Sequence, residues 1–141
     1  MAISKREKIL AAFKTALLPT AGIGNRVFRS DPEAVTLENV PCIDLAWLNE
    51  QASPDTVPQL ERTLSVQVSV LVRGDVPDLL ADPIITDAHA RIMADATLGG
   101  LAIDIRLDDA SFDFVSADNS AGKLTHQYSV KFRHSYTDMT T

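Results

Sequence analysis

The stretch Glu61-Arg-Thr-Leu-Ser-Val-Gln-Val-Ser-Val-Leu-Val-Arg73 alternates apolar and polar side chains, and Leu71 alone breaks the pattern. Side chains of a strand point alternately to its two faces, so one face carries five apolar groups. These are Leu64, Val66, Val68, Val70 and Val72. The other face carries mainly Thr, Ser and Gln. The alternation predicts a long strand in a sheet that has one covered face.

A second stretch, residues 122–136, repeats the pattern near the end of the sequence. Its apolar face comprises Leu124, Tyr128, Val130, Phe132 and Tyr136. Its other face comprises Thr, Gln, Ser, Lys and Arg side chains. Both stretches are long against the five or six residues of a typical strand. We interpret them as the centre of an antiparallel sheet whose polar face meets water or another subunit.

The N-terminal segment has the spacing of an amphipathic helix. Ser4-Lys-Arg-Glu7 is a capping box, in which the Ser4 side chain accepts the Glu7 amide and the Glu7 carboxylate reaches back to Ser4. Apolar residues then recur three and four positions apart until Pro19. This pattern predicts a helix over residues 5–18.

A second helix is predicted after residue 82. Asp82 is suited to the N-cap and Pro83 to the first helical position, where its missing N–H costs nothing. The apolar residues of the following segment again have helical spacing. We expect Gly99-Gly100 to end this helix in a left-handed conformation.

Shorter segments complete the predicted order of elements. Alternation and flanking turn residues predict short strands at residues 26–29, 41–48, 101–107 and 111–115. Loops or turns are predicted at residues 21–25, 30–40 and 49–58, at Asp108-Asp109 and at residues 117–122, and a frayed tail at residues 138–141. The result is one α+β domain over residues 1–141. It contains a mostly antiparallel twisted sheet with two main helices packed on one face.

The composition limits the classes of function. The chain has 141 residues, 45% hydrophobic and 23% charged, which is ordinary for one globular domain. Its apolar runs are shorter than the ~20 residues of a membrane span, so we expect no membrane partner. One cysteine excludes an intrachain disulfide and suits a reducing compartment. The net charge is −6, with positive ends and an acidic middle, which argues against specific nucleic-acid binding.

The sequence offers no convergent set of catalytic or metal-binding residues. His126 and His134 share a predicted strand face but stand about 26 Å apart at ~3.3 Å per residue. His89 is expected to pack at the edge of the core, and Cys42 to be a small buried or half-buried filler. The glycines of residues 21–25 follow a helix, a context that favours a turn over a phosphate loop. We therefore predict no catalytic residue, no metal site, no cofactor and no enzyme activity.

Several carboxylates do occur close together in the sequence. Asp104, Asp108, Asp109 and Asp113 could form a paired-acid or cation site. The run lacks the glycine and the regular spacing of oxygen ligands that a cation loop requires. We interpret it as a solvated acidic turn.

Two motifs resemble those of the tail terminator proteins of tailed bacteriophages, which are also called minor tail or tail completion proteins. One is the run Ala81-Asp-Pro83 followed by Asp95-Ala-Thr-Leu-Gly-Gly-Leu-Ala-Ile-Asp104. The other is the closing strand Leu124-Thr-His-Gln-Tyr-Ser-Val-Lys-Phe-Arg133, which is similar to the family pattern Thr-x-x-Tyr-x-Val-x-Tyr/Phe-Arg. The resemblance extends over nearly the whole chain.

This resemblance implies an α+β protein of the virion that assembles in the host bacterial cytoplasm. Its subunits would form a ring, six-membered in the family, at the head-proximal end of the tail tube. The ring would stop tube growth and offer a surface to the neck or head connector protein, and in contractile tails to the sheath protein. We expect the Asn49–Pro58 loop and the polar faces of strands 61–73 and 123–136 to make these contacts.

Other functions remain open at this point. A neck or head-completion protein of the same virion would differ in partner rather than in fold. A small-molecule-binding module or enzyme would use His126 and the carboxylates between Asp104 and Asp113. Nucleic-acid binding would use the basic residues between positions 5 and 29 and would depend steeply on salt.

Overall fold

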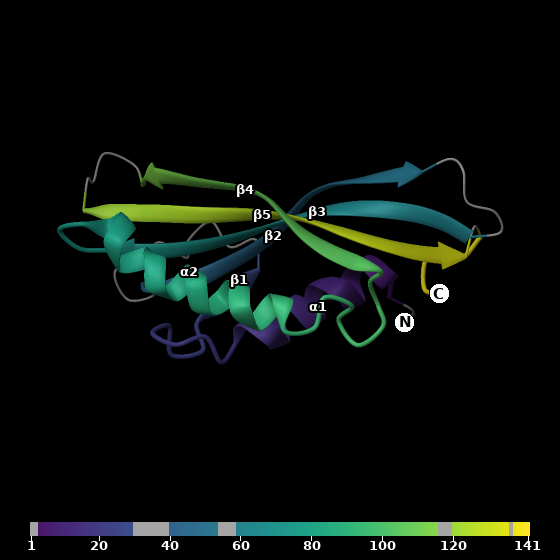
Figure 1. Cartoon of the computed structure of the whole chain (residues 1–141), viewed down its shortest axis with the longest axis horizontal. Helices are drawn as coiled ribbons and strands as arrows, with labels where there is room; N and C mark the ends of the chain where they lie inside the picture. The colour runs from purple at the N-terminus through teal and green to yellow at the C-terminus, as the bar shows by residue number, and fades with distance from the viewer. Residues whose placement is uncertain (1–2, 30–39, 54–58, 116–119, 136) are drawn as a thin grey trace.

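The computed structural model describes residues 3–29, 40–53, 59–115, 120–135 and 137–141. The elements follow in the order α1 (Lys5–Leu17), β1 (Val27–Arg29), β2 (Cys42–Ser53), β3 (Gln59–Arg73), α2 (Pro77–Met93), β4 (Asp104–Phe114) and β5 (Ala121–Ser135). The strands form one sheet of order β1-β2-β3-β5-β4. β1 runs parallel to β2 and the other pairs are antiparallel. Figure 1 shows a strongly twisted sheet with both helices on one face, which confirms the predicted α+β class.

The two long alternating stretches form the centre of the sheet, as predicted. β3 and β5 pair without interruption from Gln59 opposite Ser135 to Arg73 opposite Ala121. The predicted apolar face of β3 is completely buried, and Tyr128, Val130 and Phe132 of β5 are buried beside it. Tyr136, which the sequence placed on this face, lies outside the described residues. The period-two pattern thus fixes which face of the sheet the helices cover.

Both helices bury their apolar stripes against this face. α1 contributes Ile9, Leu10, Phe13 and Leu17, and α2 contributes mainly Ile84, Ile85, Ala88 and Ile92. The Phe13 ring meets the Tyr128 ring edge-on, with centroids 6.2 Å apart. Each large apolar side chain buried in this way contributes about 1.5–3 kcal/mol to the free energy of unfolding.

The start of α1 matches the predicted cap in one half only. The Ser4 hydroxyl accepts the Glu7 amide at 3.2 Å. The Glu7 carboxylate pairs with Arg29 of β1 instead of returning to Ser4. This ion pair, which also lowers the pKa of Glu7, ties the helix to the neighbouring strand. An ion pair with Arg29 therefore replaces the second hydrogen bond of the predicted capping box, the one from the Ser4 amide to the Glu7 carboxylate.

The predicted start and end of the second helix were wrong. α2 begins at Pro77 and ends at Met93, so Pro83 lies inside it. Pro77 occupies the first helical position that the sequence assigned to Pro83. Pro83 has no N–H to donate to the Leu79 carbonyl, four residues earlier in the helix. Both residues lie on the exposed side of α2, where water can reach the backbone. Gly99 and Gly100 have positive φ but form a turn beyond the helix.

One long strand replaces the two short strands predicted near the acidic run. β4 continues from Asp104 to Phe114, and the predicted turn at Asp108-Asp109 is a β-bulge that leaves Asp108 without a partner across the ladder. The Asp108 carboxylate accepts hydrogen bonds from Arg106 and from Ser129 of β5. These side-chain bonds hold the extra residue within the strand, a local irregularity that period-two alternation does not predict.

The second strand was also predicted too short. β2 continues from Cys42 to Ser53, and its ladder with β3 shifts between Trp47 and Asn49. The first part of the predicted 49–58 loop is therefore strand, and residues 54–58 lie outside the described part of the chain. Most of the predicted 30–40 loop also lies outside it. The predicted turn at residues 21–25 and short strand at residues 26–29 are confirmed, the strand as Val27–Arg29.

The C-terminal residues are not a frayed tail. The Lys5 amide donates to the Met139 carbonyl at 2.7 Å, and the Lys8 ammonium donates to the Thr140 carbonyl at 3.1 Å. The first amides of a helix have no partner within the helix, so the tail supplies one of them. Residues 138–141 thereby connect the end of the chain to the start of α1.

Candidate interaction surfaces

The sheet face opposite the helices is polar. Alternate residues of β3 and β5 place Thr63, Ser65, Gln67, Gln127, Ser129 and Lys131 on it. Among the described residues no helix covers this face (Figure 1). At its centre the hydroxyls of Ser69 and Thr125 are buried and lie 3.0 Å apart in a hydrogen bond. The sequence prediction placed the polar side chains of β3 and β5 on the correct face of the sheet.

A small hollow on this face is lined by charged and hydroxyl side chains. Thr63, Asp104, Arg106, Ser129 and Lys131 surround a volume of about 180 Å³. The Arg106 guanidinium bonds the Asp108 carboxylate at 2.8 Å. Hydrogen bonds from Ser129 and Arg106 lower the pKa of Asp108. These charges neutralise each other, so the hollow offers no concentrated charge of one sign.

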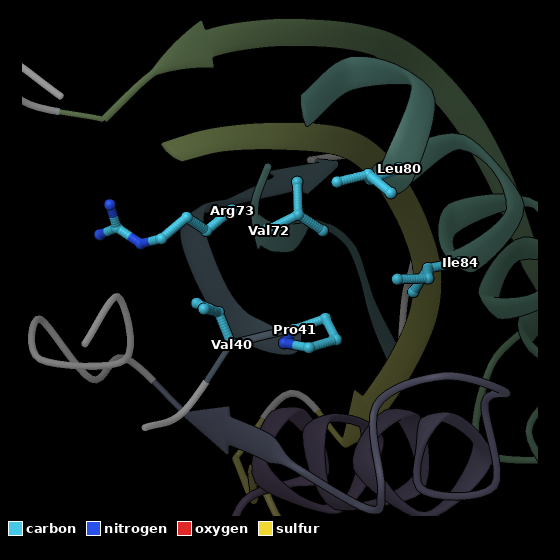
Figure 2. A pocket seen from close by; sticks show the side chains of 6 residues that line it. All are labelled: Val40, Pro41, Val72, Arg73, Leu80 and Ile84. Carbon is cyan, nitrogen blue, oxygen red and sulfur yellow. The ribbon is translucent and has the colours of Figure 1, made fainter. Parts of the chain in front are cut away.

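An apolar pocket lies between the start of α2 and the adjoining ends of β2 and β3. It has a volume of about 200 Å³ and is lined by Val40, Pro41, Val72, Leu80, Ile84 and Arg73. Figure 2 shows the apolar side chains around the space and the Arg73 guanidinium extending away from it. The Arg73 guanidinium donates to the Ser120 hydroxyl at 3.3 Å. The pocket can hold an apolar side chain, and the lining residues that the structure describes include no carboxylate, histidine, cysteine or hydroxyl side chain.

Two histidines meet at one tyrosine on the covered side of the sheet. His89 of α2 and His126 of β5 approach the Tyr128 hydroxyl with Nδ1 at 2.8 and 3.3 Å. Their rings lie 5.9 Å apart. Burial, with a smaller contribution from the charge of His89, lowers the pKa of His126, and burial raises the pKa of Tyr128. The geometry is that of a hydrogen-bonded group at the core edge.

Sequence reasoning placed His89 at the core edge, and the structure confirms this. It did not pair His89 with His126, because the two lie on different elements. Their positions in the apolar repeats of α2 and β5 were the available signal. His134, the partner considered for His126, is buried and bonds the Ser135 carbonyl.

The other sequence candidates do not converge. Asp104, Asp109 and Asp113 are spread along the exposed strand β4, at ~3.3 Å per residue. Within the described residues no group of three His, Cys, Asp or Glu side chains is placed to hold a metal ion. The Cys42 thiol is fully buried beside Leu71, as predicted for a filler. No helix in the described part of the chain is long and apolar enough to span a membrane.

Comparisons with known proteins give a structural likeness and no family. No protein-family model matches the sequence, and no curated protein does. Among solved structures, the fold is similar to a chain of the "Virion of native gene transfer agent (GTA) particle", with a TM-score of 0.52 and 12% sequence identity. The alignment covers 89% of this chain and 95% of that one. At this identity the likeness establishes the shared fold.

Proposed function

We propose that this chain is a structural subunit of a phage-like virion, in which it forms the ring that ends the tail tube. The observation that carries the proposal is the likeness to a virion chain over nearly the full length of both chains. In this role the protein performs no reaction and requires no cofactor.

The surfaces described above support this role. A ring closes through two different patches on each subunit, one for each neighbour. In its described part the chain offers a polar sheet face that no helix covers, exposed strand edges and an apolar pocket. A stable contact of this kind buries about 800 Å² on each partner. The ring would be hexameric and would offer one side to the tube and the other to the neck or head connector protein, with the sheath as a further neighbour in a contractile tail.

The tail-binding part of the proposal is tested with purified tail tubes. Gold-labelled protein is mixed with tubes and with isolated portal and neck complexes, and each mixture is imaged by electron microscopy. We expect label at one end of each tube and a halt in tube growth when the protein is added to polymerising tube subunits. Label confined to portal or neck complexes would overturn the terminator role in favour of a neck or head-completion protein. Binding to neither would overturn both.

A further inference from the structure

The order of the strands leaves two long edges of the sheet without a partner among the described residues. β1 covers only Ile43–Leu45 on the outer side of β2, so the outer edge of β2 from Ala46 to Ser53 is free in the described structure. β4 is the last strand at the opposite edge and pairs only with β5. A free edge presents unpaired N–H and C=O groups to another strand. The two free edges lie on opposite sides of the sheet.

The two edges differ in charge. β4 carries four carboxylates, Asp104, Asp108, Asp109 and Asp113, and one guanidinium, Arg106. Lys131 and Lys123 of β5 lie opposite Asp104 and Asp113 in the ladder, so the edge and its neighbours together keep one negative charge. The free part of β2 carries only Glu50, whose carboxylate lies between the guanidinium groups of Arg6 and Arg62. This edge is positive on balance. Two β4 edges would repel each other, whereas a β4 edge and a β2 edge attract.

Each edge also carries exposed apolar side chains. Trp47 is 40% exposed and Leu48 is 50% exposed on β2, while Leu107 is 37% and Phe114 is 55% exposed on β4. The Arg6 guanidinium lies 4.6 Å above the Trp47 ring, a cation–π contact that holds the ring at the edge. Burial of these groups between two molecules would supply the apolar part of a contact.

Both edges contain a bulge. The ladder shifts at Leu48 in β2 and at Asp108 in β4. Bulges restrict pairing because they redirect the hydrogen-bonding groups of an edge. An edge of this kind accepts a matched partner strand and resists unspecific growth of the sheet.

We infer that the β4 edge of one copy docks on the β2 edge of the next copy, so that the sheet continues from subunit to subunit. The inference rests on the proposed ring and names the contact that closes it. The contact is head-to-tail because its two halves lie on opposite edges of one sheet. We assign a second copy of this chain to each edge. The second copy brings a negative β4 edge to the positive β2 edge, and a positive β2 edge to the negative β4 edge.

Two single substitutions test this contact. Leu48→Glu places a negative charge on the β2 edge, opposite the acidic β4 edge. Asp109→Lys places a positive charge on the β4 edge, opposite Arg6 and Arg62. The control is Asp78→Lys, which makes the same change of charge as Asp109→Lys at an exposed site on α2. Assembly is measured by native mass spectrometry and light scattering over a range of concentrations.

We expect each edge variant to need about tenfold or more protein for assembly than the wild type, and Asp78→Lys to assemble normally. Mixing Leu48→Glu with Asp109→Lys should restore association, because each supplies the edge that the other has lost. This rescue also shows that both variants are folded. Assembly of either edge variant at the wild-type concentration, or absence of association in the mixture, would overturn the inference. If the wild type forms a ring but the variants give one of these contrary results, the edge contact is wrong and the proposed function stands. If the wild-type chain never assembles, the edge contact and the proposed function are both overturned.

Discussion

The Tyr128 hydroxyl lies between His89 and His126, and the protonation equilibrium of His126 is shifted in the folded protein. The pKa of His126 is lowered from 6.5, mainly by burial and further by the charge of His89. The folded chain therefore binds fewer protons at this site than the unfolded chain does once the pH falls below about 6.5. The stability contributed by neutral His126 is complete above that pH and is lost as the pH falls toward the lowered pKa.

This sign gives a direct prediction for His126→Leu. The wild-type midpoint of urea unfolding should fall more steeply between pH 7 and pH 5 than that of the variant. Leu fills this half-buried site with a side chain that does not titrate, and it leaves the His89–Tyr128 hydrogen bond intact. The two midpoints should run parallel between pH 7 and pH 9, which serves as an internal control. Equal slopes below pH 7 would show that His126 does not carry this pH dependence.

The Glu50 carboxylate is nearly buried in its ion pairs, with its side chain 5% exposed. It bonds Arg62 and lies 3.5 Å from Arg6. Glu50→Ala would leave two partly buried guanidinium groups facing each other. We expect a loss of about 1–3 kcal/mol in the free energy of unfolding, as for a buried charge that loses its partner. Urea titration measures this loss.

Glu61→Ala is the matched control for Glu50→Ala. Glu61 also pairs with two cations, Arg133 and Lys131, but its side chain is 20% exposed. Water should screen this network more, so the loss should be smaller. A cost at Glu61 equal to that at Glu50 would contradict the assignment to burial.

At the scale of single elements, a glycine fixes the packing of α2 on the sheet. A Cβ atom at Gly122 would lie 2.6 Å from the Phe112 ring and 2.8 Å from the Cβ of Pro77, the first residue of α2. Gly122→Ala must therefore move the Phe112 ring and the start of α2. We expect a loss of about 1–3 kcal/mol in the free energy of unfolding, measured by urea titration.

Gly74→Ala is the control for Gly122→Ala. Its new Cβ would meet only the Leu80 side chain, at 2.2 Å from Cδ1, and this side chain is exposed and can rotate. The loss should be clearly smaller than for Gly122→Ala. The reverse order of the two losses would contradict the described packing of α2.

The C-terminal residues make a further prediction at this scale. Removal of residues 138–141 takes away the carbonyl groups of Met139 and Thr140 that Lys5 and Lys8 bond. Amide hydrogens of the first turn of α1 should then exchange faster, while those of β3 and β5 should be unchanged. Unchanged exchange at the start of α1 would show that the tail does not stabilise the helix.

Local sequence patterns predicted some elements closely and misplaced others. The alternation in β3 and β5 and the apolar spacing of α1 predicted these elements to within a few residues. The start of α2 was misplaced because Pro77 and Pro83 both suit a first helical turn, and only packing decides between them. The bulges at Leu48 and Asp108 depend on neighbouring strands, which short-range alternation does not contain.

At the scale of the whole molecule, the predicted one-sided sheet explains why the chain offers surfaces to a partner. Both helices cover one face, so among the described residues neither the polar face nor the outer edges of β2 and β4 are covered by a helix (Figure 1). The sequence predicted the polar face from Thr, Ser and Gln at alternate positions. It did not predict which strands form the free edges, because strand order follows from long-range pairing. The meeting of His89 with His126 was missed for the same reason.

The proposed closed ring of identical subunits is tested by negative-stain electron microscopy of the purified protein, alone and with tail tubes. We expect rings with a central hole of the same bore as the tube, either in the protein alone or at the tube end. Single monomers in both samples at tens of micromolar would contradict it.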